Sequence, residues 1–338
     1  MVRKGLDGLD LSADRLALLA PRLGAAGALT VKGTPEAGGW SGTTIFLSDE
    51  AGTGYVLRAE PATTGGLFAE HDLANQIHCM RYVSDNGLPA PHILFEDLGG
   101  ELFDRPVYVM ERIMGYVPED DYPPFTRAGR VFDADDAKRR ALSLNLIELM
   151  AKLHRLPAPE GLSLGPSLVD YLDQLAGMRS DDDTVDAELD SVRDHLIATV
   201  PKPDVPISMI WGDGRPANVI LNDEFEVIGM LDWELAGTGP AELDIAWMLE
   251  MNRLRASEKK PDPIMSGFLT EAETWQHWSE LVGREPAHVD WHMLFAAYRV
   301  SVFLDQNYRA LIRRGEVQSD DPGITDNRTR RRMRALLA

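Results

Sequence analysis

The chain has 338 residues, of which 44% are apolar, a single cysteine and a formal net charge of −20. This length is long for one compact domain, so we expect two lobes, and the negative charge argues against nucleic acid as the main partner, because a phosphate backbone requires a basic surface. The lack of any run of about 18 apolar residues argues against a membrane partner, and the single cysteine, which excludes an internal disulfide, fits a cytoplasmic protein.

The N-terminal part of the chain is predicted to be rich in strands. Residues 9–23 have the spacing of an amphipathic helix and lack the apolar segment of a signal peptide. A glycine-rich turn precedes two short strands, residues 43–47 and 55–59, which a second turn joins into a hairpin. A helix over residues 68–84 follows, and a further strand ends near Glu111.

The remainder of the chain is predicted to be mainly helical. Apolar residues recur at helical spacing between residues 135 and 156, and aromatic-rich helical patterns, whose aromatics we assign to the core, occupy the last third of the chain. Between them, a polar loop at residues 211–218 leads into a hairpin of two strands, residues 219–221 and 227–231. A strand-rich part followed by a helical part predicts an α+β architecture of two lobes, with the boundary after residue 113.

Three polar residues stand in apolar surroundings in and after this loop. Asp213 and Asn218 belong to "WGDGRPAN", and Asp232 follows the strand "VIGML". The first two match the Asp-x4-Asn part of a kinase catalytic loop. Phosphoryl transfer needs an aligned nucleophile and Mg²⁺ to offset charge, and Mg²⁺ prefers oxygen ligands. We predict that Asp213 orients an acceptor hydroxyl and takes its proton, while Asn218 and Asp232 bind Mg²⁺; the alternative is a set of turn and cap residues.

The region around these residues resembles the catalytic core of the aminoglycoside phosphotransferase-like kinase family, including its homoserine- and choline-kinase relatives: "WGDGRPANVIL…VIGMLDWELAGTGPAELDIAWML". It is more similar still to the branch found as kinase domains fused to, or neighbouring, acyl-CoA dehydrogenases. Less specific segments follow the family's order: "GGWSGTTIFL", "GYVLRAEP", "GLPAPHI", "RPVYVMERIMG", "LMAKLHRL" and "WHMLFAAYRVSVFL". The resemblance implies a protein-kinase-like fold and transfer of phosphate from ATP, with Mg²⁺, to a hydroxyl group of a small molecule. It also implies a nucleotide-binding lobe at residues 1–113 and a catalytic and substrate-binding lobe at residues 114–338.

The resemblance further implies which residues bind the nucleotide. Arg58 stands at the position of the family's ATP-anchoring basic residue, and Val56, on the same strand face, would pack on the adenine. Ser41 and Gly42 fall in the turn that covers the phosphates, where Gly42 permits close backbone approach and Ser41 would donate a hydrogen bond. The family's hinge, whose backbone bonds the adenine, falls here at Glu111, Arg112 and Ile113.

Three positions depart from the family pattern. Trp211 replaces the histidine that supports the catalytic loop, and an indole can also pack beneath that loop. Arg58 replaces the usual lysine but keeps its charge. Gln76 stands where the family has the glutamate partner of that basic residue; Asp72, one turn earlier, and Glu70 are the other candidates, and the sequence does not choose among them.

Further candidate residues have both functional and structural interpretations. Asp244 matches a family residue that braces the catalytic loop, and we assign it to structural support. We favour helix-end packing for His154 over catalysis. Glu234 and Glu242 flank the expected metal segment and either shape the substrate entrance or are solvated. The arginines of residues 328–334 are expected to be solvated and balanced by acidic residues, rather than to bind an anion or a membrane.

The leading interpretation is therefore a small-molecule kinase. Its acceptor is either an aminoglycoside-like alcohol or a hydroxyacyl or CoA-linked metabolite. An alternative, motivated by the three departures from the family pattern, is a nucleotide-binding pseudokinase that acts as a scaffold. A protein-directed kinase is disfavoured because the Asp-Phe-Gly and Ala-Pro-Glu motifs of a regulated activation loop are missing from the sequence. The sequence leaves the oligomeric state open.

Overall fold

The computed structural model describes residues 8–35, 42–61, 72–120, 123–162, 167–178, 186–202, 206–256 and 262–338. The chain forms two compact units. The first unit comprises Met1–Tyr116 together with two later segments, Ile220–Asn222 and Ile228–Glu234; the second unit comprises Val117–Val219, Asp223–Val227 and Leu235–Ala338. The polypeptide therefore returns twice to the first unit after leaving it, and the second return carries Asp232.

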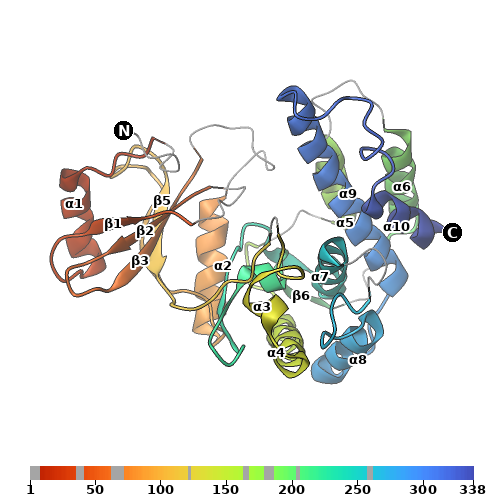
Figure 1. Cartoon of the computed structure of the whole chain (residues 1–338), viewed down its shortest axis with the longest axis horizontal. Coiled ribbons are helices and arrows are strands. Elements are labelled where there is room, and N and C mark those ends of the chain that lie inside the picture. Colours follow the sequence, from red (N-terminus) through yellow and green to blue (C-terminus); the bar gives the residue numbers. More distant parts are fainter. Residues whose placement is uncertain are drawn as a thin grey trace. The chain divides into compact units, whose positions relative to one another are not determined.

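The first unit is built on a five-stranded antiparallel sheet of order β1-β2-β3-β5-β4 (Figure 1). Its elements are α1 (Ala13–Leu23), β1 (Thr30–Gly33), β2 (Thr43–Ser48), β3 (Gly54–Ala59), α2 (Leu73–Asp85), β4 (Ile93–Asp97) and β5 (Val107–Glu111). Leu16 and Leu19 of α1 pack in one apolar cluster with Ile45, Leu57 and Val109 of the sheet. Alternating β-branched and apolar residues in the strands supply this buried face, as expected for a sheet that is covered on one side.

The predicted elements of this unit are largely confirmed. The expected hairpin is formed by β2 and β3, which pair in register from Thr43↔Ala59 to Ser48↔Gly54. The helix expected over residues 68–84 is α2, which begins at Leu73; residues 62–71 lie outside the described part of the chain. Two strands, β1 and β4, were not predicted. Both are short and alternate between half-buried and exposed residues, so neither has the apolar run that would mark a strand in the sequence.

The second unit is mainly helical. Its helices are α3 (Gly129–Asp133), α4 (Asp136–His154), α5 (Leu168–Gly177), α6 (Ala187–Ala198), α7 (Glu242–Arg255), α8 (Glu271–Val282), α9 (Val289–Arg313) and α10 (Arg328–Leu337). A two-stranded sheet pairs β6 (Ile207–Ile210) with β9 (Gly237–Pro240). A second two-stranded sheet pairs β7 (Val219–Leu221) with β8 (Val227–Met230), and each of these strands begins in the second unit and carries the chain into the first. The loop-plus-hairpin arrangement predicted from the sequence is confirmed.

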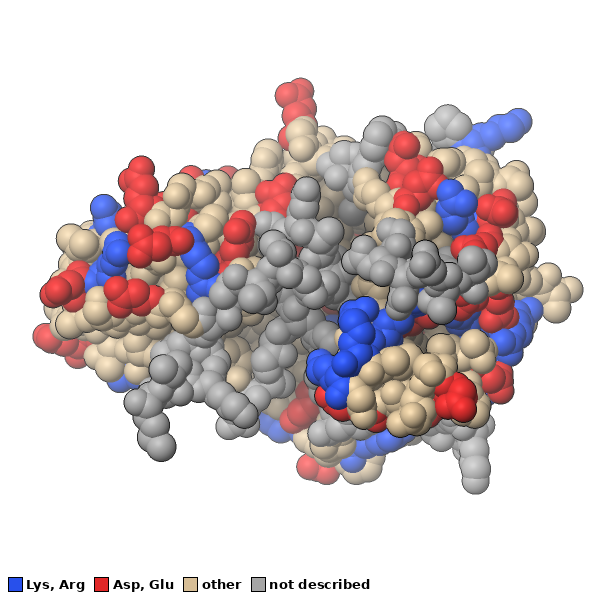
Figure 2. All heavy atoms as spheres, turned by 90° about the horizontal axis from the view of Figure 1, so that it is seen from above, with Lys and Arg blue, Asp and Glu red and all other residues tan. Residues whose placement is uncertain are grey.

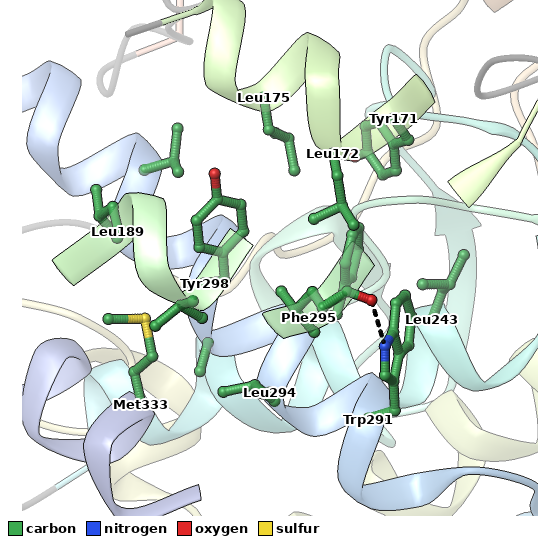
Figure 3. Packing of buried hydrophobic residues seen from close by; sticks show 14 of the residues in the cluster. Tyr171, Leu172, Leu175, Leu189, Leu243, Trp291, Leu294, Phe295, Tyr298 and Met333 are labelled. Carbon is green, nitrogen blue, oxygen red and sulfur yellow. Dashed lines mark hydrogen bonds between the residues drawn. The ribbon is translucent and has the colours of Figure 1, made fainter. Parts of the chain in front are cut away.

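The core of the second unit forms where α5, α6, α9 and α10 lie together (Figure 1). Figure 3 shows Trp291 and Phe295 of α9 packed with Leu172 of α5, while the indole of Trp291 donates a hydrogen bond to the carbonyl of Leu196 at 3.1 Å. The rings of Trp291 and Phe295 stack with their centroids 5.3 Å apart. The prediction that the C-terminal aromatics belong to the core is confirmed for these residues.

The basic C-terminal helix is neutralised by acidic side chains. Arg330 pairs with Asp186 and Glu188, and Arg334 also pairs with Glu188, at 2.5 Å. The expected charge balance is thus confirmed, but the expected solvation is wrong for Arg330, whose side chain is only 1% exposed. On the face seen in Figure 2, basic side chains lie among acidic ones. None of the described helices is both long enough and apolar enough to cross a bilayer.

Candidate active site

The loop that carries Asp213 turns sharply at Gly212. Strand β6 leads into the loop, and a 3₁₀ turn (Pro216–Asn218) leads out of it into β7. Gly212 has a φ of +83°, and a Cβ atom there would lie 1.9 Å from the carbonyl oxygen of Leu235. Only glycine can adopt the left-handed conformation and also allow this close approach. The backbone conformation at the start of the loop therefore requires glycine at this position.

Asp244 braces this loop by binding its backbone, which is the structural support expected for this residue. Its side chain is fully buried and accepts hydrogen bonds from the backbone amides of Trp211 at 2.6 Å and Gly212 at 2.7 Å. Its third partner is Nε2 of His154, at 3.1 Å. Hydrogen bonds from backbone amides to a carboxylate are short and strong. These bonds therefore compensate the buried charge of Asp244 and hold the loop.

His154 has a more specific role than helix-end packing. Its Nδ1 lies 3.0 Å from Nε1 of Trp278, and an indole nitrogen can only donate. Nδ1 must therefore accept, which places the imidazole proton on Nε2, where it is donated to Asp244. The packing interpretation is thus incomplete, because the histidine links the end of α4 to the carboxylate that braces the loop.

Trp211 supports the same loop by packing. Its indole is fully buried, and a Cβ at Gly214 would lie 2.8 Å from Trp211 Cε3 and 3.2 Å from the Cε atom of Met150. The large ring thus fills the space directly beneath the loop.

The carboxylate of Asp213 is held by three side chains. Its Oδ1 accepts from Nε1 of Trp247 at 2.6 Å, and Nε of Arg215 lies 2.9 Å and 3.0 Å from its two oxygens. Nδ2 of Asn218 donates to Asp213 Oδ2 at 2.7 Å and to the Asp213 carbonyl at 2.9 Å. Asp213 and Asn218, which the sequence singled out, are thus in direct contact and both buried.

Arg215 extends this cluster to two residues that the sequence reasoning missed. Nη1 of Arg215 lies 2.5 Å from Oδ1 of Asp120, which also lies 2.7 Å from Nη2 of Arg255. Burial would lower the pKa of Arg215, but Asp213 and Asp120 raise that pKa above its ordinary value. Burial would likewise raise the pKa of Asp120, whereas the two arginines lower it. The cluster is therefore ionised at neutral pH, with charges of both signs beside Asp213.

In the first unit, Arg58 lies in an environment that favours its charge. It pairs with Tyr108 across strands β3 and β5, and its Nη1 donates to Oγ1 of Thr44 at 3.1 Å. Burial acts to lower the pKa of Arg58, but Tyr108 and then the carboxylates of Asp232 and Glu234 raise it above its ordinary value. The segment Ile228–Glu234, which belongs to the first unit, therefore supplies negative charge near Arg58.

Two candidate helix partners of Arg58 have other contacts within the first unit. The hydroxyl of Tyr108 donates to Oε1 of Gln76 at 3.2 Å, so Gln76 bonds the tyrosine that neighbours Arg58. Asp72 is the N-cap of α2, where its carboxylate accepts from the amide of Asn75 at 2.8 Å. Glu70 lies outside the described residues.

Asp232 adopts an uncommon backbone conformation. Its φ is +61°, in the left-handed region that non-glycine residues rarely occupy, and it directly follows β8 and Leu231. The next residue, Trp233, is buried, and its indole donates to the carbonyl of Met230 at 3.2 Å. The anchored indole fixes the chain on one side of Asp232, which permits the strained conformation. Such strain is concentrated at functional sites.

The remaining predicted nucleotide residues belong to the same sheet. Val56 is buried in β3 between Phe46 and Met110 of the neighbouring strands. At the end of β5, the amide of Glu111 donates to the carbonyl of His92 and the amide of Arg112 to that of Gly54. Gly42 directly precedes β2 and lies close to the neighbouring strand, since a Cβ there would lie 3.0 Å from the carbonyl of Ala59. Ser41 lies outside the described residues, and Ile113 is the last of the three hinge residues, two positions after the end of β5.

The structure tests one further expectation and reveals one residue that the sequence reasoning missed. Glu242 is fully buried and binds Arg284 at 2.6 Å and 3.1 Å, so the expectation of a solvated or substrate-facing residue is wrong. Arg299 of α9 was missed: it is 4% exposed, donates to the carbonyl of Gly212 at 3.2 Å, and stacks 4.0 Å from the ring centroid of Trp247. Its signal in the sequence was weak because a lone arginine in an aromatic helix resembles a surface residue.

The donor atoms fit Mg²⁺ in part. Both short contacts of the Asn218 amide nitrogen go to Asp213, so Oδ1 is the amide oxygen that remains for a metal. Oδ1 of Asp232 is a buried carboxylate oxygen. Among the residues that the structure describes, no group of three or more His, Cys, Asp or Glu side chains is arranged around a metal position. Amide and carboxylate oxygens are each ligand types that Mg²⁺ accepts, and Mg²⁺ rarely uses an all-protein cage.

Comparisons with solved structures show a similar fold. A structure described as a putative aminoglycoside phosphotransferase from Ralstonia eutropha JMP134 matches with a TM-score of 0.70 and 20% identity, covering 97% of this chain and 96% of that one. A thermostable mutant of an aminoglycoside phosphotransferase, in a ternary complex with ADP and hygromycin B, matches with a TM-score of 0.57 and 17% identity over 95% and 97% of the two chains. The predicted protein-kinase-like, α+β fold is confirmed.

A sequence relative confirms the expected branch. Acyl-CoA dehydrogenase family member 11 of Gallus gallus is 28% identical over 233 residues, which cover 66% of this chain. The chain spans only 28% of the length of that relative. The model of the Phosphotransferase enzyme family matches residues 32–281, a range that includes the strands of the first unit from β2 onward and the whole loop around Asp213. The chain therefore belongs to the Phosphotransferase enzyme family.

Proposed function

We propose that this family member is an ATP- and Mg²⁺-dependent kinase that phosphorylates a hydroxyl group of a small molecule. The observation that carries the proposal is the fixed carboxylate of Asp213. Three side chains hold this carboxylate, in the loop whose start Asp244 braces. A carboxylate in this position suits an acceptor hydroxyl that must be aligned and deprotonated.

In the proposed reaction, Asp213 accepts a hydrogen bond from the acceptor hydroxyl and takes its proton as the hydroxyl oxygen bonds to the γ-phosphorus of ATP. The bond between that phosphorus and the β–γ bridging oxygen breaks, and ADP leaves. Arg215, held between Asp213 and Asp120, supplies positive charge beside the reacting oxygen. Asn218 and Asp232 would hold Mg²⁺, which offsets the charge of the phosphates when bound. The contacts of Asn218 with Asp213 mean that the metal ligand and the base are positioned by one short loop.

The proposed nucleotide site uses residues of the first unit. Arg58 would bind phosphate, Ser41 and Gly42 would cover it, and Val56 would contact the adenine. Because the amides of Glu111 and Arg112 already donate within the unit, we assign the hinge hydrogen bond from a backbone amide to Ile113. We assign Gln76 an indirect role, through Tyr108, in holding the strand that faces Arg58.

The acceptor is proposed to be an aminoglycoside-like alcohol or a hydroxyacyl or CoA-linked metabolite. The relative named as an acyl-CoA dehydrogenase family member supports the second class. The arginine pair beside Asp213 would also suit an anionic acceptor. The competing proposal is a pseudokinase scaffold, motivated by Trp211, Arg58 and Gln76; the packing of Trp211 beneath the loop favours an active site instead.

The decisive experiment screens γ-labelled ATP against fractionated cell metabolites with the wild-type protein and Asp213→Asn. We expect a labelled small molecule with wild type, and a loss of at least about 1,000-fold with Asp213→Asn at nearly unchanged Mg²⁺-ATP affinity, because the base is removed but the nucleotide contacts remain. Asp223→Asn is the matched control, since the Asp223 side chain is 86% exposed and pairs with Arg130. Tight nucleotide binding by a wild type that labels no metabolite would favour the scaffold.

A further inference from the structure

Trp247 makes a contact that core packing alone does not require. It lies on α7, is buried, and its Nε1 lies 2.6 Å from Oδ1 of Asp213. An aromatic core residue needs no carboxylate partner, and an indole nitrogen can only donate. The donor therefore fixes one oxygen of the carboxylate that the proposed function uses as its base.

The helix that carries Trp247 supports the loop at two further points. Asp244 is one turn earlier on α7 and binds the amides of Trp211 and Gly212. Arg255, at the last residue of α7, binds Asp120, which in turn binds Arg215. Residues separated by three and by eleven positions lie on the same side of an α-helix. One face of α7 therefore fixes the loop backbone, the Asp213 carboxylate and the partner of Arg215.

Both ends of α7 are tied to the rest of the second unit. At its start, Glu242 is bound by Arg284 and by the amide of Ala287. At its end, Nη1 of Arg328 donates to the carbonyls of residues 253, 254 and 256, at distances of 2.7, 3.1 and 2.7 Å. These contacts satisfy carbonyls that the last turn of a helix otherwise leaves without partners. The helix is thus held at both termini while its central face contacts the loop.

The indole itself is fixed by its neighbours. The guanidinium of Arg299 lies over its ring at 4.0 Å and also donates to the carbonyl of Gly212. Phe303 contacts the ring edge-on, with the two centroids 5.7 Å apart. Arg299 therefore touches both the residue that holds Asp213 and the backbone one position before Asp213.

We propose that Trp247 is a positioning residue for phosphoryl transfer, which orients Asp213 through its indole N–H while Arg299 holds the ring. This role rests on the proposed kinase function. Trp247→Phe removes the N–H but keeps an aromatic face for Arg299, so it tests the hydrogen bond with little change in packing. Trp275→Phe is the matched control: Trp275 is buried in α8 of the same unit, and its Nε1 has no hydrogen-bond partner among the described residues.

The first readout is kinetic and uses the acceptor identified by the metabolite screen. We expect Trp247→Phe to lower kcat by roughly 10- to 100-fold, as for loss of a hydrogen bond to a charged group, with KM for ATP and acceptor changed by less than about twofold. Trp275→Phe is expected to retain kcat within about twofold. A Trp247→Phe variant with wild-type kcat would overturn the positioning role, as would a loss of kcat that is accompanied by loss of ATP affinity.

The second readout needs no turnover. In protein labelled with ¹⁵N-tryptophan, the chain gives up to seven indole resonances, and Trp247→Phe identifies one of them. We expect that resonance to lie at the downfield end and to move in Asp213→Asn, while the Trp275 resonance stays in place. An insensitive Trp247 resonance would overturn the contact. A wild type that shows the contact but phosphorylates no acceptor would overturn the proposed function, and with it the kinetic role of Trp247.

Discussion

Replacing Asp244 by asparagine keeps the shape of the side chain but exchanges one acceptor oxygen for an NH₂ group. In the structure, Oδ2 accepts from Trp211 N–H and His154 Nε2–H, and Oδ1 accepts from Gly212 N–H. Whichever way the amide turns, its NH₂ group faces at least one N–H donor. The best arrangement keeps the two bonds at the Oδ2 position and leaves the amide of Gly212 without an acceptor.

The expected cost follows from these three contacts. A buried donor without a partner costs about 1–3 kcal/mol, and each of the two remaining bonds loses about 1 kcal/mol when the acceptor becomes neutral. We therefore expect Asp244→Asn to destabilise the loop by about 3–5 kcal/mol. Because Asp244 is fully buried, solvent does not screen this loss.

The assay is hydrogen exchange of a peptide that covers residues 209–214, together with urea denaturation. A local loss of 3–5 kcal/mol corresponds to an increase in amide exchange of at least about 100-fold for this peptide. Asp290→Asn, at an exposed residue in the first turn of α9, is the control and should change stability by less than about 0.5 kcal/mol. Unchanged exchange in Asp244→Asn, or a loss below about 1 kcal/mol, would refute the bracing role.

Two further predictions concern the second unit. Burial lowers the pKa of His292 from its ordinary value of 6.5 to about 4, although the charge of Glu242 acts to raise it. Below pH 6.5, His292 therefore binds a proton in the unfolded chain but stays neutral in the folded chain until the pH nears 4. The free energy of unfolding should thus fall by about 2 kcal/mol from this group as the pH drops from about 6.5 to 5. In urea titrations, His292→Leu should lack that part of the pH dependence. The same change of unfolding free energy with pH in wild type and variant would contradict the prediction. Arg330→Met should destabilise the unit by about 3–5 kcal/mol, because it removes the buried cation that pairs with Asp186 and lies near the buried Asp305, which keeps Arg309 as a partner. Arg331→Met, at a half-exposed arginine, should cost less than about 1 kcal/mol, and equal losses in thermal melts would show that burial does not set the difference.

The sequence predicted the parts of the site that are local in the chain. Asp213 and Asn218 are five positions apart, so their contact is a property of one loop, and the hairpin that leads to Asp232 has clear strand signals. The rest of the loop's environment was beyond prediction. Asp120 and Arg255 come from distant segments, and the pairing of Asp120 with both Arg215 and Arg255 depends on how α7 packs. No periodic pattern encodes such a contact.

Two errors share one physical cause. Glu242 and Arg330 are charged residues in helices, and charged residues are usually exposed, so solvation was expected for Arg330 and was one of two alternatives for Glu242. Each is buried because a partner of opposite charge lies within reach: Arg284 for the glutamate, Asp186 for the arginine. A single sequence gives the charge of a residue but not its partner, and burial depends on that partner.

The return of residues 220–222 and 228–234 to the first unit sets an order for biosynthesis. These segments leave the ribosome only after residues 117–219, which belong to the second unit, have been made. A nascent chain that ends at Tyr116 therefore lacks part of its own unit, including the carboxylates near Arg58. Domains usually fold one after another from the N-terminus, but here completion of the first unit must wait until much of the second has been translated.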